Sequence, residues 1–312
     1  DMVQSRGLGD VYKRQAWKCP GGIGRSNCWQ FSGPEGEVVK VIAIANQKGG
    51  VGKTTTAVNL SAALAAMGRR LLLIDLDPQG NATVSVGLHK GDLAATAFEL
   101  LVEQQPLSEV ATPLESLAMD CVPADGDLTA AEVALLSVEN REQRLKTALQ
   151  AGKYLYDFVI IDCPPSLNML TLNALVAADS VLITMQCEYF ALEGLSALME
   201  TINTVSQTVN PTLKIEGILR TLYDPRNALT NEVSEQLHQH FEGLVYRTVI
   251  PRNVRLAEAP SHGVPGIVYD RLSRGSTAYM ALAGEFMRRQ EQNKEHSCCL
   301  LYTSDAADDT DS

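Results

Sequence analysis

The sequence has few of the features that mark disulfide-rich, membrane-spanning or carbohydrate-binding proteins. Its seven cysteines include no CxxC pair, which argues against a disulfide framework and against metal ligation by paired cysteines. Aromatic residues make up only 5% of the chain. No apolar run approaches the ~20 residues that a membrane span needs, and no basic-then-apolar signal pattern opens the chain. We therefore expect a cytoplasmic protein of a reducing compartment that uses no membrane.

The size and charge of the chain set further bounds. Its 312 residues suit one large α/β domain or two small ones, and the hydrophobic fraction of 45% allows a sizeable core. The net charge is −11, from 26 basic and 37 acidic residues. Because an acidic chain does not attract nucleic acid uniformly, any DNA binding would need a local basic patch.

The two ends of the chain differ from the middle. Residues 1–37 and 291–312 lack a sustained apolar period, and the stretches at 11–15 and 301–308 resemble translated library-adaptor sequence. Neither end is expected to join a packed core, so we predict disordered or non-native tails. The adaptor-like stretches favour non-native tails, and ordinary disordered tails are the alternative. The remaining residues, 38–290, are predicted to form one domain.

Within that domain, short apolar runs alternate with helical segments. Several runs are apolar throughout, as strands buried on both faces should be. The predicted strands are 38–45, 70–75, 117–122, 158–162, 180–185, 214–222 and 244–250, and the predicted helices are 54–67, 127–136, 141–150, 168–177, 192–207, 231–240 and 277–290. This alternation predicts an α/β fold with a mostly parallel, twisted sheet and helices on both faces.

A glycine-rich loop joins the first predicted strand to the first predicted helix. Strand, glycine loop and helix in this order are typical of a P-loop NTPase. The glycines allow backbone N–H groups to turn toward one anion, and the helix adds its positive N-terminal end. We expect Lys53 to reach the β- and γ-phosphates and Thr54 to coordinate Mg²⁺. The predicted nucleotide-binding residues of the loop are Lys48, Gly49, Gly50, Val51, Gly52, Lys53, Thr54 and Thr55. A glycine-rich turn with solvated lysines is the alternative.

Two later strands end in carboxylates. One apolar strand runs into Asp75 and Asp77, which share a face if the strand extends that far. A second ends at Asp162, an arrangement typical of a Walker B strand, and Asp162 is expected to hold Mg²⁺ through water. At the carboxyl ends of parallel strands, these side chains would face the ligand crevice. A capping role before Pro78 is the alternative for Asp77.

The loop also resembles that of a known family. The usual P-loop pattern has glycine at position 47, where this chain has Gln47, and an extra lysine follows at position 48. The sequence from Lys48 to Thr55 resembles the deviant Walker A motif of the ParA/MinD ATPases, and its surroundings resemble the ParA/Soj branch. The resemblance implies that Lys48 reaches the ATP of a partner subunit in a homodimer. It also implies that Asp75 belongs to the magnesium shell and that Asp77 acts on the attacking water.

A segment after the last predicted strand resembles the same branch. Pro251 offers an apolar face to a base, and Asn253 or nearby backbone could read the edge of adenine. Asn253 could instead cap a short helix, and the two roles are compatible.

Arginines are frequent in the same part of the chain. Arg226 and Arg255 match DNA-contact positions of the family, where contacts to phosphates would be independent of base sequence. Solvated surface arginines are the alternative.

The resemblance favours a DNA-partitioning ATPase. In this reading the ATP-bound homodimer holds nonspecific double-stranded DNA, and hydrolysis, stimulated by a ParB-like protein, releases it. The protein would then associate with the nucleoid in the cytoplasm. The alternative is a MinD-like positioning ATPase on another cargo or surface, although residues 286–296 are too polar to insert into a membrane. An ATP-dependent amidoligase would need an added substrate domain, and an iron–sulfur ATPase would need paired cysteines.

Overall fold

The computed structural model describes residues 39–304, with side chains to residue 293. The predicted tail at 1–37 lies outside the described residues, as does the end of the chain from residue 305. The elements are β1 (Lys40–Ala45), α2 (Lys53–Ala66), β2 (Leu71–Asp75), α3 (Asn81–Ser85), α4 (Leu107–Val110), β3 (Thr112–Leu114), β4 (Met119–Val122), α5 (Leu128–Leu135), α6 (Arg144–Gln150), β5 (Phe158–Asp162), α7 (Met169–Ala177), β6 (Ser180–Gln186), α8 (Ala191–Thr208), β7 (Lys214–Tyr223), α9 (Ala228–His240), β8 (Val245–Pro251), α10 (Val254–Glu258), α11 (Gly266–Tyr269) and α12 (Arg274–Ser304). Short 3₁₀ turns and one π turn at Glu99–Glu103 link some of them.

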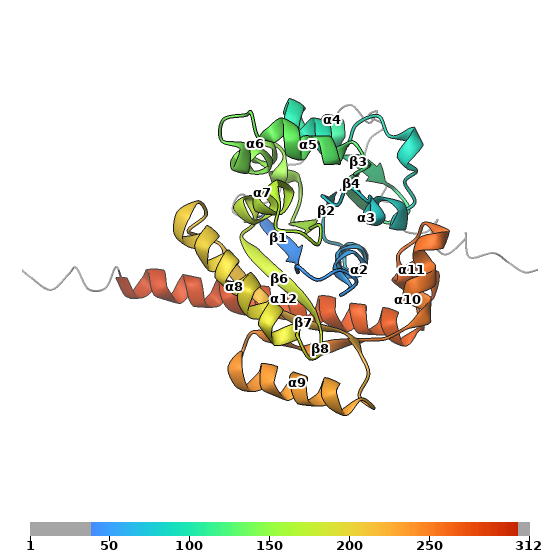
Figure 1. The fold of residues 1–312 in the computed structure, drawn as a ribbon, viewed down its shortest axis with the longest axis vertical. Helices are drawn as coiled ribbons and strands as arrows, with labels where there is room; N and C mark the ends of the chain where they lie inside the picture. Colours follow the sequence, from blue (N-terminus) through green and yellow to red (C-terminus); the bar gives the residue numbers. More distant parts are fainter. Residues whose placement is uncertain (1–38, 305–312) are drawn as a thin grey trace, which may run out of the picture. The chain divides into compact units, whose positions relative to one another are not determined.

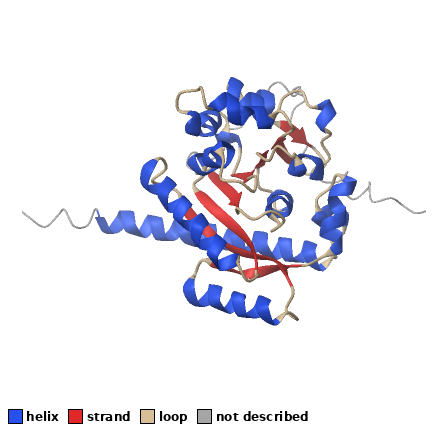
Figure 2. Ribbon diagram, viewed as in Figure 1, coloured by secondary structure: helices blue, strands red, loops and turns tan. Residues whose placement is uncertain are grey.

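The strands form one eight-stranded sheet in the order β3-β4-β2-β5-β1-β6-β7-β8 (Figure 1). Every neighbouring pair is parallel except β3 and β4. Figure 2 shows the twisted sheet as a red layer with helices on both sides. The predicted fold class is therefore confirmed.

Alternate residues of the central strands pack into two separate hydrophobic cores, one on each face of the sheet. On β1, Val41 and Ala43 pack with α7 and α8, whereas Ile42 and Ile44 pack with α2 and α12. This division follows from the two-residue period of a strand, which sends successive side chains to opposite faces. Because helices cover both faces, both sets of side chains are apolar, as the uninterrupted apolar runs predicted.

All seven predicted strands and all seven predicted helices are present, with small differences at their ends. The prediction missed β3, a three-residue antiparallel edge strand that contains Pro113, and the short helices α3, α4 and α11, whereas α10 is the short helix that Asn253 was expected to cap as the alternative. The last helix is longer than predicted, because α12 continues past residue 290, the predicted end of the domain, to Ser304. None of the described helices is long and apolar enough to cross a membrane.

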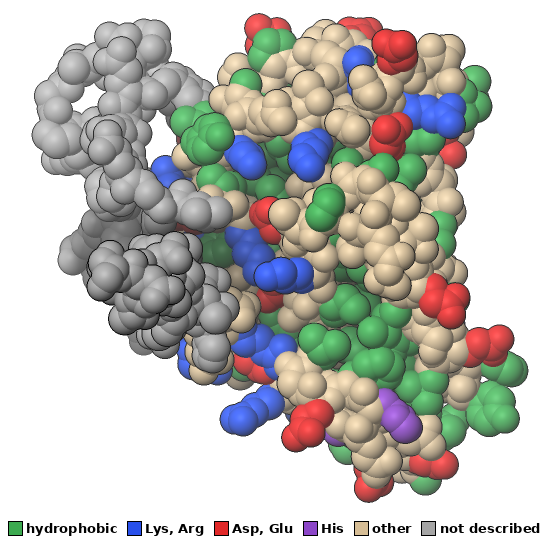
Figure 3. Space-filling model, turned by 90° about the vertical axis from the view of Figure 1, so that its left-hand side faces the viewer, with side chains coloured by type: hydrophobic (Ala, Val, Ile, Leu, Met, Phe, Trp, Pro, Cys, Tyr) green, Lys and Arg blue, Asp and Glu red, His purple; other side chains and the backbone are tan. Residues whose placement is uncertain are grey.

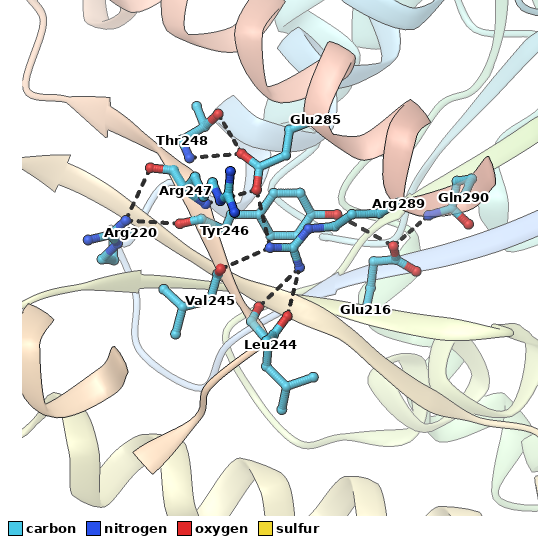
Figure 4. A network of polar contacts seen from close by, with 11 residues as sticks. Glu216, Arg220, Leu244, Val245, Tyr246, Arg247, Thr248, Glu285, Arg289 and Gln290 are labelled. Atoms are coloured by element: carbon cyan, nitrogen blue, oxygen red, sulfur yellow. Dashed lines mark hydrogen bonds and ion pairs between the residues drawn. The ribbon is translucent and has the colours of Figure 1, made fainter. Parts of the chain in front are cut away.

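Helix α12 fastens the edge strand β8 (Figure 4). The Glu285 carboxylate accepts hydrogen bonds of 2.8 Å from the backbone N–H groups of Arg247 and Thr248 and one of 2.7 Å from the Thr248 hydroxyl. The Arg289 guanidinium donates to the Val245 carbonyl at 2.9 Å and lies 3.9 Å from the centre of the Tyr246 ring. These contacts satisfy backbone groups that an edge strand otherwise leaves unpaired. They also fix the strand that ends at Pro251.

Candidate active site

The glycine loop connects β1 to α2 at the carboxyl end of the central strand. Gly50 and Gly52 have φ values of 72° and 82°, in the left-handed region that residues with a Cβ rarely adopt. Gly52 is the N-cap of α2, so the helix begins at Lys53, and Thr54 and Thr55 lie in its first turn. The first N–H groups of α2 thus lack helical partners and can bind an anion.

The loop is anchored from the neighbouring part of the sheet. The Thr221 hydroxyl on β7 donates a 2.7 Å hydrogen bond to the carbonyl of Val51, whose side chain is buried. This bond holds the middle of the loop against β7. The sequence analysis did not identify Thr221, because a threonine in an apolar strand carries no signal for a contact 170 residues away.

The two lysines of the loop lie in different environments. Lys53 is only 7% exposed, and its Nζ donates to the carbonyl of Lys48 at 3.1 Å. Burial lowers the pKa of Lys53, while the charge of Asp162 opposes that shift. Lys48 has a side chain that is 51% exposed and forms an ion pair with Glu188. One lysine therefore points into the site and the other toward the surface.

The carboxylates of the two strand ends lie side by side. Asp75 and Asp162 are register partners on the adjacent parallel strands β2 and β5. Asp162 is fully buried, and neither of its carboxylate oxygens has a hydrogen-bond partner in the part of the chain with described side chains. The Thr54 hydroxyl is near enough to favour the charged carboxylate, although no hydrogen bond of normal geometry joins them. Burial, followed by the charge of Asp75, raises the pKa of Asp162 well above its ordinary value.

Asp75 differs from Asp162 because its oxygens are occupied. One oxygen accepts hydrogen bonds of 2.8 Å from both the backbone N–H and the hydroxyl of Thr83, and the other accepts one of 3.1 Å from the N–H of Asp77. Burial raises the pKa of Asp75 to about 6. Since β2 ends at Asp75, Asp77 lies on the following turn, where its side chain accepts a bond from Gln79 N–H at 2.9 Å. The strand therefore does not extend to Asp77, and Asp75 and Asp77 do not share a strand face.

The predicted adenine segment lies beside the anchored loop. Pro251 pairs with Tyr223 on β7, two residues beyond the Thr221 that holds Val51. Asn253 caps α10, its side chain accepting a 3.2 Å hydrogen bond from the N–H of Leu256. The helix-cap alternative is therefore correct.

A cavity of about 280 Å³ lies beside the N-terminal half of α2. Thr54 and Thr55 contribute to its wall, together with residues of α3 and of the segment from α10 to α11. Pro251 and Asn253 do not line it. The predicted base site and this cavity are thus different places.

Both predicted DNA-contact arginines carry local ion pairs. Arg226 follows β7 and makes two hydrogen bonds of 2.9 Å to Asp224, although its side chain is 88% exposed. Arg255 on α10 pairs with Glu258 at 2.9 Å and with Asp270 at 3.4 Å. Their charges are present at the surface but are offset by neighbouring carboxylates.

Comparison with known proteins places this site in a family. Residues 39–215 match a family model described as an AAA domain. The chain is 53% identical to the sporulation initiation inhibitor protein Soj of Bacillus subtilis, with 79% of this chain and 97% of that protein covered. It is 52% identical to the chromosome partitioning protein ParA of Myxococcus xanthus, with 81% of this chain and 89% of that protein covered.

A solved structure shares the fold and carries a nucleotide. It is the structure of cobyrinic acid a,c-diamide synthase from Mycobacterium smegmatis with bound ATP analog and magnesium. Its TM-score is 0.72 at 39% identity, with 82% of this chain and 97% of that chain covered. The Soj and ParA relatives both exceed 50% identity, well above the 39% of this structural neighbour. The chain therefore belongs to the ParA/Soj family of chromosome-partitioning ATPases.

Proposed function

We propose that this ATPase binds ATP with Mg²⁺ on the 48–55 loop. The observation that carries the proposal is buried Asp162, whose carboxylate oxygens have no hydrogen-bond partner within the described side chains, in the same site as buried Lys53. A buried, unpaired carboxylate is costly unless a cation joins it, and Mg²⁺ prefers carboxylate and phosphate oxygens. The site therefore fits a magnesium nucleotide.

Each residue has a distinct task in this proposal. Lys53 and the N–H groups of the first turn of α2 would hold the phosphates, and Thr54 and Asp162 would hold Mg²⁺, which when bound would supply positive charge to the phosphate oxygens. Asp77 orients the attacking water. Asp75 is proposed to belong to the magnesium shell without binding the metal directly, since its oxygens already accept hydrogen bonds from Thr83 and from the Asp77 backbone.

The ATP-bound form is proposed to be a homodimer in which Lys48 reaches the partner's nucleotide. The Lys48 side chain is half exposed and lies at the surface, from which it could extend to a second copy once its ion pair with Glu188 breaks. Two aromatic residues next to its ion-pair partner, Tyr189 and Phe190, are 74% and 73% exposed and stack edge to face. Large apolar side chains at such exposure commonly mark a protein interface, and a second copy would cover them.

The dimer is proposed to bind double-stranded DNA without regard to sequence through Arg226 and Arg255. Acidic and basic side chains are mixed on the face shown in Figure 3, and the whole chain carries a net charge of −11. Phosphates must therefore displace Asp224 from Arg226, and both Glu258 and Asp270 from Arg255. A dimer would double the number of such contacts, which explains why binding should require ATP.

A ParB-like partner is proposed to stimulate hydrolysis and so release the DNA, with the protein located on the nucleoid in the cytoplasm. The similarity to the chromosome partitioning protein ParA of Myxococcus xanthus supports a role in partitioning. The alternative is a MinD-like ATPase that positions another cargo.

The first test is nucleotide-dependent assembly. Size-exclusion chromatography with light scattering should show a monomer without nucleotide and a dimer with a nonhydrolysable ATP analogue and Mg²⁺. A chain that stays monomeric at saturating analogue would contradict the proposal.

A further inference from the structure

The side chain of Lys48 is held within its own subunit by Glu188. The Lys48 ammonium pairs with the Glu188 carboxylate, which follows the end of β6. The two side chains are 51% and 44% exposed, so the pair lies at the surface of the loop and not in the core. The lysine that is proposed to act in a partner subunit therefore forms an ion pair within its own subunit.

The backbone of Lys48 is tied to the same region. Its N–H donates a 2.9 Å hydrogen bond to the side-chain oxygen of Asn46, and the Asn46 amide donates at 2.6 Å to the carbonyl of Thr184 on β6. The side chain and the main chain of Lys48 are therefore both fastened to β6 and its carboxyl end.

The phosphate-binding lysine adds a third contact. Lys53 Nζ donates to the Lys48 carbonyl at 3.1 Å. A phosphate oxygen is a stronger acceptor than a carbonyl because it is charged. Phosphate at this loop would therefore draw Lys53 away from Lys48 and remove one of the three restraints.

We propose that Glu188 is a positioning residue that retains Lys48 in the nucleotide-free monomer, so that dimerisation requires this ion pair to break. The inference rests on the proposed function, in which Lys48 acts across a dimer. Phosphate binding loosens the loop through Lys53, and the ion pair with Glu188 then remains as the restraint on the side chain of Lys48, beside the backbone hydrogen bond to Asn46. Glu188 thereby sets how readily Lys48 becomes available to a second copy.

The size of the effect follows from the exposure of the pair. One exposed ion pair changes an equilibrium by a factor of about 1.4 to 5. Each dimer releases two such pairs, so removing them should tighten the dimer by roughly 2- to 25-fold. Salt screens exposed charges, so the difference should shrink as ionic strength rises.

The test compares Glu188→Gln with the wild-type chain by sedimentation equilibrium in a nonhydrolysable ATP analogue and Mg²⁺. The expected result is a lower dimer dissociation constant in Glu188→Gln and an intermediate value in Glu188→Asp. Glu193→Gln is the matched control, because it removes the same charge from an exposed position in the first turn of α8. It should behave as the wild type does.

A second measurement uses the nucleotide-free monomer. Acylation of Lys48, followed by mass spectrometry, should be faster in Glu188→Gln, while exposed Lys214 in the same molecule reacts unchanged. Equal labelling of Lys48, or a dimer no tighter than that of the wild type, would overturn the restraint while leaving the proposed function intact. A wild-type chain that never dimerises would overturn both.

Discussion

The contacts of Glu285 predict that one side chain of α12 contributes strongly to stability. Glu285→Ala removes three hydrogen bonds from Arg247 and Thr248, together with an ion pair to Arg289 at 3.1 Å. A hydrogen bond to a charged group contributes about 1.5–3 kcal/mol, but the freed N–H groups of an edge strand regain water. We therefore expect a loss of about 2–4 kcal/mol, well below the sum of the three bonds.

Chemical and thermal unfolding, followed by circular dichroism, measure this loss. For a domain of this size, it corresponds to a fall in Tm of roughly 4–16 °C. Glu291→Ala is the matched control, since Glu291 is exposed on the same helix. If Glu285→Ala unfolds at the same denaturant concentration as the control, the fastening of β8 by α12 does not stabilise the fold.

The same carboxylate predicts a dependence on pH. Burial alone would raise the pKa of Glu285, but hydrogen bonds from Thr248 and Arg247 outweigh it and lower the pKa. A lowered folded-state pKa means that the unfolded chain binds the proton more readily, so this contribution is present above the unfolded pKa and is lost as pH falls through the folded pKa. The difference in unfolding free energy between wild type and Glu285→Ala should therefore narrow in acid. A constant difference would contradict the assignment.

The remaining predictions concern the site. Lys53→Ala should abolish ATP binding measured with a fluorescent analogue, because the loop loses its phosphate cation. Lys48→Ala should spare binding but lose the ATP-dependent dimer, and a dimer as stable as the wild type would defeat the trans-acting role. Asp77→Ala should trap the ATP-bound dimer, whereas phosphate release near the wild-type rate would rule out its role on water. Asp224→Asn frees Arg226, so it should strengthen DNA binding by about two- to five-fold at low salt, and weaker or equal binding would show that Arg226 does not meet phosphate.

Much of the fold could be predicted from local pattern. Apolar runs identified β1, β2 and β5 because strands buried on both faces have no polar side to interrupt them. The edge strand β3 escaped notice because a three-residue antiparallel segment with Pro113 has no period to detect. The extent of α12 was underestimated because its last turns are polar and then irregular in composition.

The site was predictable where the chemistry is local in sequence. The loop from Lys48 to Thr55 is contiguous, so its glycines and lysines could be read together. Asp75 lies beside Asp162 because β2 and β5 are adjacent parallel strands, but which residues pair across these strands could not be derived from the sequence alone. Thr83 was missed because it lies on the short helix α3, which the pattern did not predict, and Glu188 was missed because its contact with Lys48 joins segments 140 residues apart.

The most direct test of partitioning is a gel shift of nonspecific duplex DNA at two salt concentrations, with and without ATP. The account predicts that the wild type binds only with ATP, ignores base sequence and binds less tightly at high salt. Arg226→Glu and Arg255→Glu should each weaken binding while the ATP-dependent dimer persists, and Lys214→Glu, an exposed change at the opposite end of β7, should not. A wild-type ATP dimer that ignores DNA would contradict the account and point to another cargo.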